Sequence, residues 1–313
     1  MKLFGMKNLT TRFLLFLFTV LSRQSWRTLY RLSDLLKYLI FDLVGYRKDV
    51  VLVNLRNSFP EKEEAEIQKI ARDYSRNLTD LVVEAVKLRS ITREEVNQRF
   101  TYDPRVFEHY YAQNKNLVLV LGHLGNWELA NLFASLNFPH QVVVVYHRLA
   151  NDTFEDWFYK IRTQFGSELV PMNEAYQKAG VPRQRPFMFL LVNDQSPRPD
   201  KAYWTTFLNQ DTGVFRGVER IARQLDAPVL YGVIGRDENR RGHYTIGVRL
   251  ITENPKEIPN NGILERQIKL LEADIRRQPA NWLWSHKRWK HPRPAQLQPD
   301  QVLEVNFDCE KAD

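Results

Sequence analysis

No other stretch of this sequence limits its fold as strongly as five consecutive apolar residues, Leu117–Leu121. They lead directly into the motif G-H-L-G-N-W-E, in which Gly122 and Gly125 free the backbone just where the apolar run stops. An apolar run of this length, bounded by glycine, is typical of a buried strand that ends in a turn. The sequence therefore places the imidazole of His123 at the carboxyl end of a buried strand.

Strand-like and helix-like stretches alternate along the rest of the chain. The apolar runs that predict strands are Leu117–Leu121, Val142–Tyr146, Phe187–Val192, Val229–Ile234 and Tyr244–Ile251. The stretches with helical spacing are Trp127–Leu136, Thr153–Phe165, Val214–Leu225 and Ile263–Arg277. Another helix is expected to open at Pro60, followed by an acidic first turn. The pattern predicts an α/β fold with a central, mostly parallel or mixed sheet flanked by helices.

Length, charge and cysteine content restrict the class of protein. The 313 residues are 43% hydrophobic, which is enough for one large domain or two small ones with a sizeable core. A formal net charge of +8 favours an anionic partner such as a phospholipid surface, an acidic carrier, a phosphorylated substrate or nucleic acid. The single cysteine, Cys309, lies in a polar tail, so no disulfide framework is expected and a reducing compartment is indicated.

The amino end carries a membrane signal. The apolar run Phe13–Leu21 lies between Arg12 and Arg23 and would span only about 14 Å as a helix, against roughly 30 Å of hydrocarbon. The next stretch, Leu29–Val44, has apolar residues at helical spacing. Two amphipathic helices lying in one leaflet are therefore expected, with a cleaved signal peptide and ordinary core helices as the alternatives. We divide the chain into an anchoring segment (1–45), a main domain (46–293) and a polar tail (294–313).

A histidine followed by a carboxylate is a plausible acid–base device. His123 has Glu128 five residues on, one helical turn into the expected helix, and such a carboxylate can hold an imidazole that takes a proton from a hydroxyl. The same spacing recurs at His147 and Asp152, which also follow an apolar run. Spacing alone therefore does not choose between the two pairs.

Three further features are candidates for a site. Arg162 lies late in a helix, where its cation could bind a phosphate or an oxyanion or belong to a solvated helix face. Asp194 follows the strand-like run Phe187–Val192, and the carboxyl end of a strand is a favoured site position in α/β sheets, although a polar turn is the alternative. The segment Trp282–Arg293 interleaves tryptophans with basic residues, as at a membrane interface, a phosphate site, a base-stacking surface or a packed terminal segment.

Several motifs that would point elsewhere are missing from the sequence. It contains no G-x-S-x-G, no H-E-x-x-H and no paired Cys/His ligand spacing, so a serine hydrolase or a zinc enzyme has little support. The stretch Thr205–Gly217 is interpreted as a turn-rich link into a helix, and it lacks the spacing of a nucleotide-binding loop.

In their order along the chain, these features resemble the late acyltransferases of bacterial lipid A biosynthesis. That lauroyl/myristoyl acyltransferase family belongs to the wider lysophospholipid acyltransferase group. The resemblance covers about residues 10–293 and rests on Tyr46–Glu61, Gly122–Glu128, Arg162 before a glycine, Asn193–Gln195, Phe207–Asn209, Asp226–Pro228 and the closing W-L-W-S-H-K-R-W-K. The co-linear order selects His123 with Glu128 over His147 with Asp152.

The resemblance implies a glycerol-phosphate-acyltransferase-like fold and a membrane-associated O-acyltransferase. The enzyme would transfer a fatty acyl chain from an acyl thioester to a hydroxyl of a lipid A precursor, at the cytoplasmic face of the bacterial inner membrane. His123 would be the general base. Glu128 or Asp194 would orient it, a choice that the sequence leaves open, and Arg162 would bind phosphate or steady the oxyanion.

The resemblance also implies the partners. The donor would be acyl carrier protein, or alternatively acyl-CoA, as co-substrate, and the acceptor a glycolipid or lysolipid beside anionic membrane lipids. No cofactor, metal or nucleic acid is expected, because a thioester is already activated and a positioned base suffices. The alternatives are an acceptor of another kind (a lysophospholipid, aminolipid or mannolipid), a basic nucleic-acid-binding protein, and a non-catalytic membrane scaffold.

Overall fold

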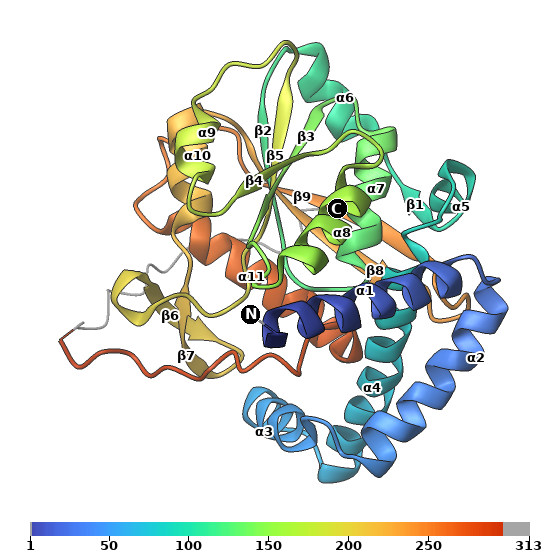
Figure 1. Ribbon diagram of the computed structural model, residues 1–313. Helices are drawn as coiled ribbons and strands as arrows, with labels where there is room; N and C mark the ends of the chain where they lie inside the picture. Colours follow the sequence, from blue (N-terminus) through green and yellow to red (C-terminus); the bar gives the residue numbers. More distant parts are fainter. Residues whose placement is uncertain (1, 297–313) are drawn as a thin grey trace.

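The computed structural model describes the backbone of residues 2–296 and side chains from Thr10 onward. Its centre is a seven-stranded sheet with the strand order β1-β9-β8-β2-β5-β3-β4 (Figure 1). Neighbouring strands run parallel except β8 and β9, which are antiparallel. The strands are β1 (Phe100–Tyr102), β2 (Leu117–Leu121), β3 (Gln141–Tyr146), β4 (Glu168–Pro171), β5 (Phe187–Val192), β8 (Val229–Arg236) and β9 (Tyr244–Thr252). The prediction of an α/β fold with a mixed central sheet is confirmed.

Helices cover both faces of this sheet, as Figure 1 shows. The helices are α1 (Lys2–Ser22), α2 (Trp26–Lys37), α3 (Lys48–Ser58), α4 (Glu64–Lys87), α5 (Arg93–Asn97), α6 (Arg105–Ala112), α7 (Trp127–Asn137), α8 (Asp152–Thr163), α9 (Ala175–Ala179), α10 (Gly217–Leu225) and α11 (Gly262–Arg277). Because side chains alternate along a strand, β2 feeds two cores. Val118 and Val120 pack with α3, α4, α10 and α11, whereas Leu117, Leu119 and Leu121 pack with α6, α7 and α8.

The N-terminal helices are packed onto the rest of the molecule. α1, α2 and α3 each contact α4, and the six residues Tyr38–Leu43 continue α2 as a π-helix. Leu29 on α2 is only 1% exposed, so this helix contributes to the core. Polar contacts also join α2 to the sheet, since Arg241 reaches Asp34 at 2.8 Å. The described residues 10–45 therefore form part of one packed body with the sheet.

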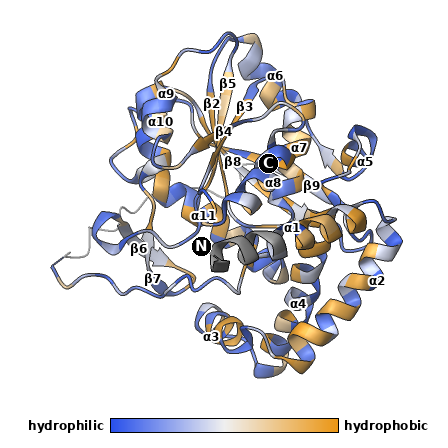
Figure 2. Cartoon of the chain, viewed as in Figure 1, coloured by the Kyte–Doolittle hydropathy of each residue, from blue (hydrophilic) through white to orange (hydrophobic). Residues whose placement is uncertain are grey.

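Large apolar side chains nevertheless remain exposed on these helices. Hydrophobic residues of α1 and α2 are coloured orange in Figure 2. Phe13 and Phe16 on α1 are 62% and 61% exposed. The group, which we call the N-terminal apolar surface, comprises Phe13, Phe16, Leu17, Val20, Leu35, Leu39, Leu43 and Val44. Among residues 2–296, no helix combines the length and the apolar character that crossing a membrane requires. The membrane-associated segment predicted from the sequence thus remains unconfirmed.

Two local elements differ from the sequence-based expectation. The helix expected to open at Pro60 begins at Glu64, because Glu63 and Glu66 form a capping box that fixes the first turn there. The stretch interpreted as a turn-rich link is an antiparallel hairpin, β6 (Tyr203–Phe207) and β7 (Gln210–Val214), before α10. Its two turn residues, Leu208 and Asn209, both have positive φ, as a tight hairpin turn requires. The end of the expected polar tail, with Cys309, lies outside the described residues.

Candidate active site

His123 stands on the short loop between β2 and α7, as its position in the sequence predicts. A Cβ on Gly122 would lie 2.5 Å from Leu271 Cδ1 and 3.2 Å from Asp194 Oδ2, so only glycine lets the chain pass here. Gly125 has φ +58°, and a Cβ there would lie 2.9 Å from the carbonyl oxygen of Ile234. The two glycines of the motif thus serve a close approach and a left-handed turn that fix the loop carrying His123.

Asp194 is the carboxylate that holds this imidazole. It follows β5, which pairs in parallel with β2 so that Val192 lies opposite Leu121, and the two strand ends meet at one edge of the sheet. Oδ1 of Asp194 lies 2.5 Å from Nδ1 of His123, and Oδ2 accepts a 2.7 Å hydrogen bond from the backbone N–H of the same histidine. Both contacts orient the ring relative to the loop.

The carboxylate of Asp194 is buried and ionised. Only 2% of the residue is exposed, and burial by itself raises the pKa of the group. The charge of His123 and its hydrogen bonds, with a further bond from Trp282, outweigh burial and lower the pKa of Asp194 to about 2. An ionised acceptor at Nδ1 keeps the proton of the neutral ring on that nitrogen, which leaves a lone pair on Nε2.

The Nε2 side of His123 faces aromatic and amide groups. Gln195 places its side-chain nitrogen 3.3 Å from Nε2. The ring of Trp127 meets the imidazole edge to face at 4.7 Å between centroids. His123 also lines a narrow crevice of about 10 Å³, together with Leu78 and Leu81 of α4, which has room for about one water molecule.

Glu128 and Arg162 contact each other rather than His123. Nε and Nη2 of Arg162 donate to the two carboxylate oxygens of Glu128 at 2.8 and 2.5 Å, a bidentate pair that joins α8 to the first turn of α7. Burial lowers the pKa of Arg162, but the hydrogen bonds and charge of Glu128 leave it raised. Of the two acids that the sequence offered, Asp194 therefore pairs with His123, and the guanidinium of Arg162 is engaged by Glu128.

The rival pair does not form. His147 is exposed, with its Nδ1 2.8 Å from the carbonyl oxygen of Arg148, and Asp152 lies in the first turn of α8. Within the part of the chain that the structure describes, no group of three or more His, Cys, Asp or Glu side chains is placed to hold a metal ion.

Sequence reasoning missed the role of Trp282. Its indole N–H donates to Oδ2 of Asp194 at 2.7 Å, and the residue is 2% exposed. Its ring packs at right angles against that of Trp284, which is fully buried. The aromatic part of the closing segment is thus a packed terminal segment. The only sequence signal was that a buried tryptophan N–H requires an acceptor.

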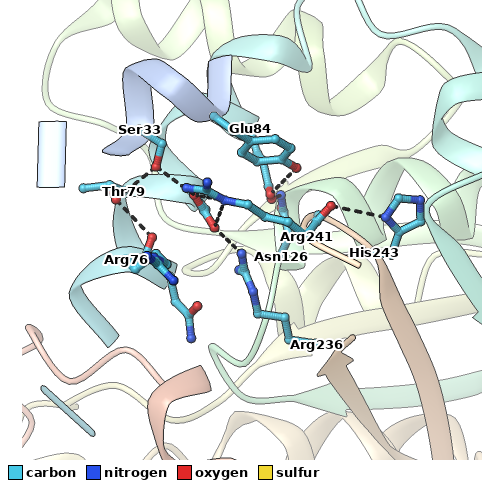
Figure 3. A network of polar contacts seen from close by, with 12 residues as sticks. Ser33, Arg76, Thr79, Glu84, Asn126, Arg236, Arg241 and His243 are labelled. Atoms are coloured by element: carbon cyan, nitrogen blue, oxygen red, sulfur yellow. Dashed lines mark hydrogen bonds and ion pairs between the residues drawn. The ribbon is translucent and has the colours of Figure 1, made fainter. Parts of the chain in front are cut away.

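A hydrogen-bond network around Glu84 holds the loop that carries His123. Asn126 caps α7 by accepting the N–H of Leu129 at 2.8 Å, and its amide donates to the buried carboxylate of Glu84 at 2.7 Å. The hydroxyls of Tyr30 on α2 and Tyr244 on β9 donate to the same carboxylate at 2.9 and 2.6 Å. Figure 3 shows Glu84 and Asn126 within this network. The loop of His123 is therefore tied to the N-terminal helices and to the sheet.

Comparison with known proteins agrees with this geometry. No curated protein sequence matches the chain. The profile of the bacterial lipid A biosynthesis acyltransferase family, however, matches it over residues 7–291. That range includes the whole sheet and the His123, Asp194 and Trp282 cluster. This chain accordingly belongs to the bacterial lipid A biosynthesis acyltransferase family and is an acyltransferase.

Proposed function

We propose that this acyltransferase transfers a fatty acyl chain from acyl carrier protein to a hydroxyl of a lipid A precursor, with His123 as the general base. The observation that carries the proposal is the 2.5 Å contact between Nδ1 of His123 and the buried Asp194, which leaves Nε2 as the base. The family to which the chain belongs supports the reaction class and the kind of acceptor.

The proposed chemistry needs one base and no covalent intermediate on the protein. Nε2 of His123 takes the proton of the acceptor hydroxyl while its oxygen attacks the thioester carbonyl carbon. The ionised Asp194 stabilises the imidazolium that forms. The tetrahedral intermediate then loses the thiolate as the carbon–sulfur bond breaks, and the thiolate takes the proton from Nε2. The amide of Gln195, beside Nε2, is a neutral donor of the kind that stabilises an oxyanion.

The Glu128–Arg162 pair takes a positioning role in this proposal. It clamps α8 to the first turn of α7, directly beside Trp127, whose ring packs against His123. Arg162 is 18% exposed in its side chain, and its five N–H groups are only partly used by Glu128. Arg162 would thereby keep the aromatic wall of the site in place.

We further propose that the enzyme works at the cytoplasmic face of the inner membrane, with the N-terminal apolar surface lying in the lipid interface. Exposed apolar patches mark interaction surfaces on folded domains, and the N-terminal apolar surface gathers its side chains within residues 13–44. A net charge of +8 favours anionic lipids and an acidic carrier protein as partners. An interfacial position would bring the lipid acceptor to the site without a spanning helix.

Reconstitution with defined substrates tests the proposal. Purified protein, acyl carrier protein loaded with one fatty acid and a lipid A precursor are incubated with phospholipid vesicles, and the lipids are analysed by mass spectrometry. We expect the acceptor to gain one acyl chain in the presence of the wild type. The His123→Ala variant should produce no measurable acylation. His147→Ala is the matched control, because His147 is exposed and outside the site, and it should transfer normally.

Two outcomes would change the proposal. Transfer to a lysophospholipid or aminolipid in place of the lipid A precursor would retain the mechanism and replace the acceptor. Near-native turnover by a folded His123→Ala protein would refute the role of His123 as the base.

A further inference from the structure

A cavity of about 400 Å³ lies beside the crevice of His123, between α4, the end of β8 and the segment Pro279–Asn281. Its volume is within the range of ligand sites, roughly 300–1,000 Å³. The cavity and the crevice of His123 share Asn77, Arg236 and Asn281 among their lining residues. A group held in the cavity would therefore be adjacent to the proposed base.

A buried carboxylate builds the inner wall of this cavity. Asp80 is fully buried and accepts a hydrogen bond from Ser33 at 2.7 Å, from Arg241 at 3.0 Å, and from Arg236. The side chains of Arg236, Arg241 and Ser33 converge in Figure 3. Asp80 thus holds two guanidinium groups on this wall, and Asp34 pairs with Arg241 from its other side.

The arginines of the cavity retain unused donors. Arg236 donates to Asp80 through Nη2 alone, and its side chain is 11% exposed, so other N–H groups of this guanidinium are accessible. Arg277 gives one N–H to Asp274 at 2.8 Å. Arg76, which is exposed, forms no side-chain hydrogen bond or ion pair with any residue from 10 to 296. A guanidinium with free N–H groups fits the oxygens of a phosphate.

Most carboxylates of the cavity already have hydrogen-bond or ion-pair partners of their own. Five cationic and four acidic side chains line it. Asp73 pairs with Lys69 at 3.0 Å, and Asp237 accepts backbone N–H groups of its own turn. Glu238 is the one acidic lining residue without a hydrogen bond or ion pair among the described residues. Its negative charge would repel a bound anion. Removing that charge should therefore strengthen anion binding, the opposite of the effect expected from removing an arginine.

We propose that this cavity binds a phosphate group carried by the lipid acceptor, with Arg76, Arg236 and Arg277 as the donors. The inference rests on the proposed function and deepens it. Two observations favour the acceptor as the source of the phosphate. The cavity lies beside α2, which Asp34 and Ser33 tie to its arginines and to Asp80, and α2 carries part of the N-terminal apolar surface. Arg162, the other candidate for an anion, is already engaged by Glu128.

Binding there would have a geometric consequence for the reaction. A phosphate held by these arginines would position the headgroup of the acceptor on one side of the crevice. His123 would accept the proton of one acceptor hydroxyl on the other side. The acceptor would then be held at two points, which converts part of its binding into correct orientation of the attacking oxygen.

Steady-state kinetics with a charge-matched control tests the inference. The double variant Arg76→Gln, Arg277→Gln removes two exposed cations of the cavity. Its control, Arg72→Gln, Arg276→Gln, removes two cations from the same helices, α4 and α11, that do not line the cavity. We expect the cavity variant to raise the KM for the acceptor by about tenfold or more, since hydrogen bonds to charged groups are strong. The control should change it less than about twofold, and Glu238→Gln should lower it.

Two kinetic outcomes would overturn the inference, and a third would leave calorimetry to decide it. An unchanged acceptor KM in the cavity variant would exclude phosphate binding there, and a rise confined to the KM for the donor would assign the cavity to the carrier's own phosphate. If the wild type transferred no acyl chain, the proposed function would fail. Calorimetry with inorganic phosphate would then decide alone, because weaker binding by the cavity variant than by its control supports the site and equal binding refutes it.

Discussion

The indole N–H of Trp282 donates a 2.7 Å hydrogen bond to Oδ2 of Asp194, the carboxylate whose other oxygen lies 2.5 Å from Nδ1 of His123. The backbone of Leu124 forms a β-bridge with that of Trp282, so the closing segment and the loop of His123 are joined twice. A residue far along the chain thus donates to the carboxylate that holds the imidazole of His123.

Replacement of this tryptophan should impair turnover more than substrate binding. Trp282→Phe keeps an aromatic ring and removes the N–H, so Asp194 loses one donor and holds His123 less firmly. We expect kcat to fall by roughly tenfold, since a hydrogen bond to a charged group contributes about 1.5–3 kcal/mol, with little change in the KM for either substrate. Initial rates at varied donor and acceptor concentrations measure both quantities.

Trp284→Phe is the matched control for that experiment. Trp284 is also buried, and its N–H donates to the carbonyl oxygen of Pro279 at 2.6 Å. The control should lose comparable stability in urea and keep most of its kcat. Equal losses of kcat in the two variants would show that the effect comes from packing and not from Asp194.

The low pKa of Asp194 predicts a pH dependence of stability. Burial raises the pKa of the group, but the charge and hydrogen bonds of His123 and the bond from Trp282 lower it from 3.8 to about 2 in the folded protein. A lowered pKa stabilises the fold above the unfolded value and loses that contribution as the pH falls through the folded value. The contribution amounts to about 2 kcal/mol at neutral pH.

Urea unfolding of the wild type and Asp194→Asn at several pH values measures this contribution. The difference in the free energy of unfolding should be constant above pH of about 5 and shrink between pH of about 4 and 2. A difference that stays constant down to pH of about 3 would contradict the ionised, His123-paired state of Asp194.

The Glu128–Arg162 pair should behave as one unit. Each side chain is less than a fifth exposed, so loss of either leaves the other charge partly buried. We expect Glu128→Gln and Arg162→Gln each to reduce transfer strongly while the protein stays folded. The double variant should be no worse than the poorer single variant, with a coupling of roughly 1–3 kcal/mol in a double-mutant cycle. Additive losses would indicate separate roles for the two residues.

The N-terminal apolar surface should govern binding to lipid. Phe13→Asp with Phe16→Asp places two charges on the most exposed part of α1, at positions 62% and 61% exposed. We expect binding to vesicles that contain anionic phospholipid to fall by at least about tenfold in flotation assays, because burial of each phenylalanine contributes about 1.5–3 kcal/mol. Val181→Asp, at an exposed valine after α9, is the control. Unchanged flotation of the double variant would exclude this surface as the contact.

The long apolar runs made the fold predictable. The apolar runs of the main domain, Leu117–Leu121, Val142–Tyr146 and Phe187–Val192, became strands β2, β3 and β5, and the glycines marked where β2 had to turn. The apolar run Phe13–Leu21 formed part of helix α1 instead. The hairpin β6–β7 escaped prediction because its turn, at Leu208 and Asn209, lacks the glycine that usually marks a tight turn, although both residues have positive φ. Local sequence carries little information about such cross-strand pairing.

The histidine and the strand-end positions were predictable, but their partners were not. Glu128 is near His123 in sequence, yet the first turn of α7 directs it to Arg162 on α8. Asp194 lies far away in sequence and reaches the ring only because β5 pairs with β2. The contribution of Trp282 depends on a chain reversal that no local pattern encodes. The pairing of β5 with β2, rather than closeness in sequence, therefore determines which carboxylate contacts His123.

The buried carboxylate of Glu84 has a consequence for how the molecule assembles. Its three donors come from α2, β9 and the cap of α7, so the charge is satisfied only when all three elements are docked. Undocking α2 would remove the Tyr30 donor from a buried anion and so weaken the network that holds the Asn126 cap. We therefore expect attachment of α2 and order in the loop of His123 to be coupled. Hydrogen exchange at the amide of Leu129 would report that coupling, rising when Tyr30 is replaced by phenylalanine.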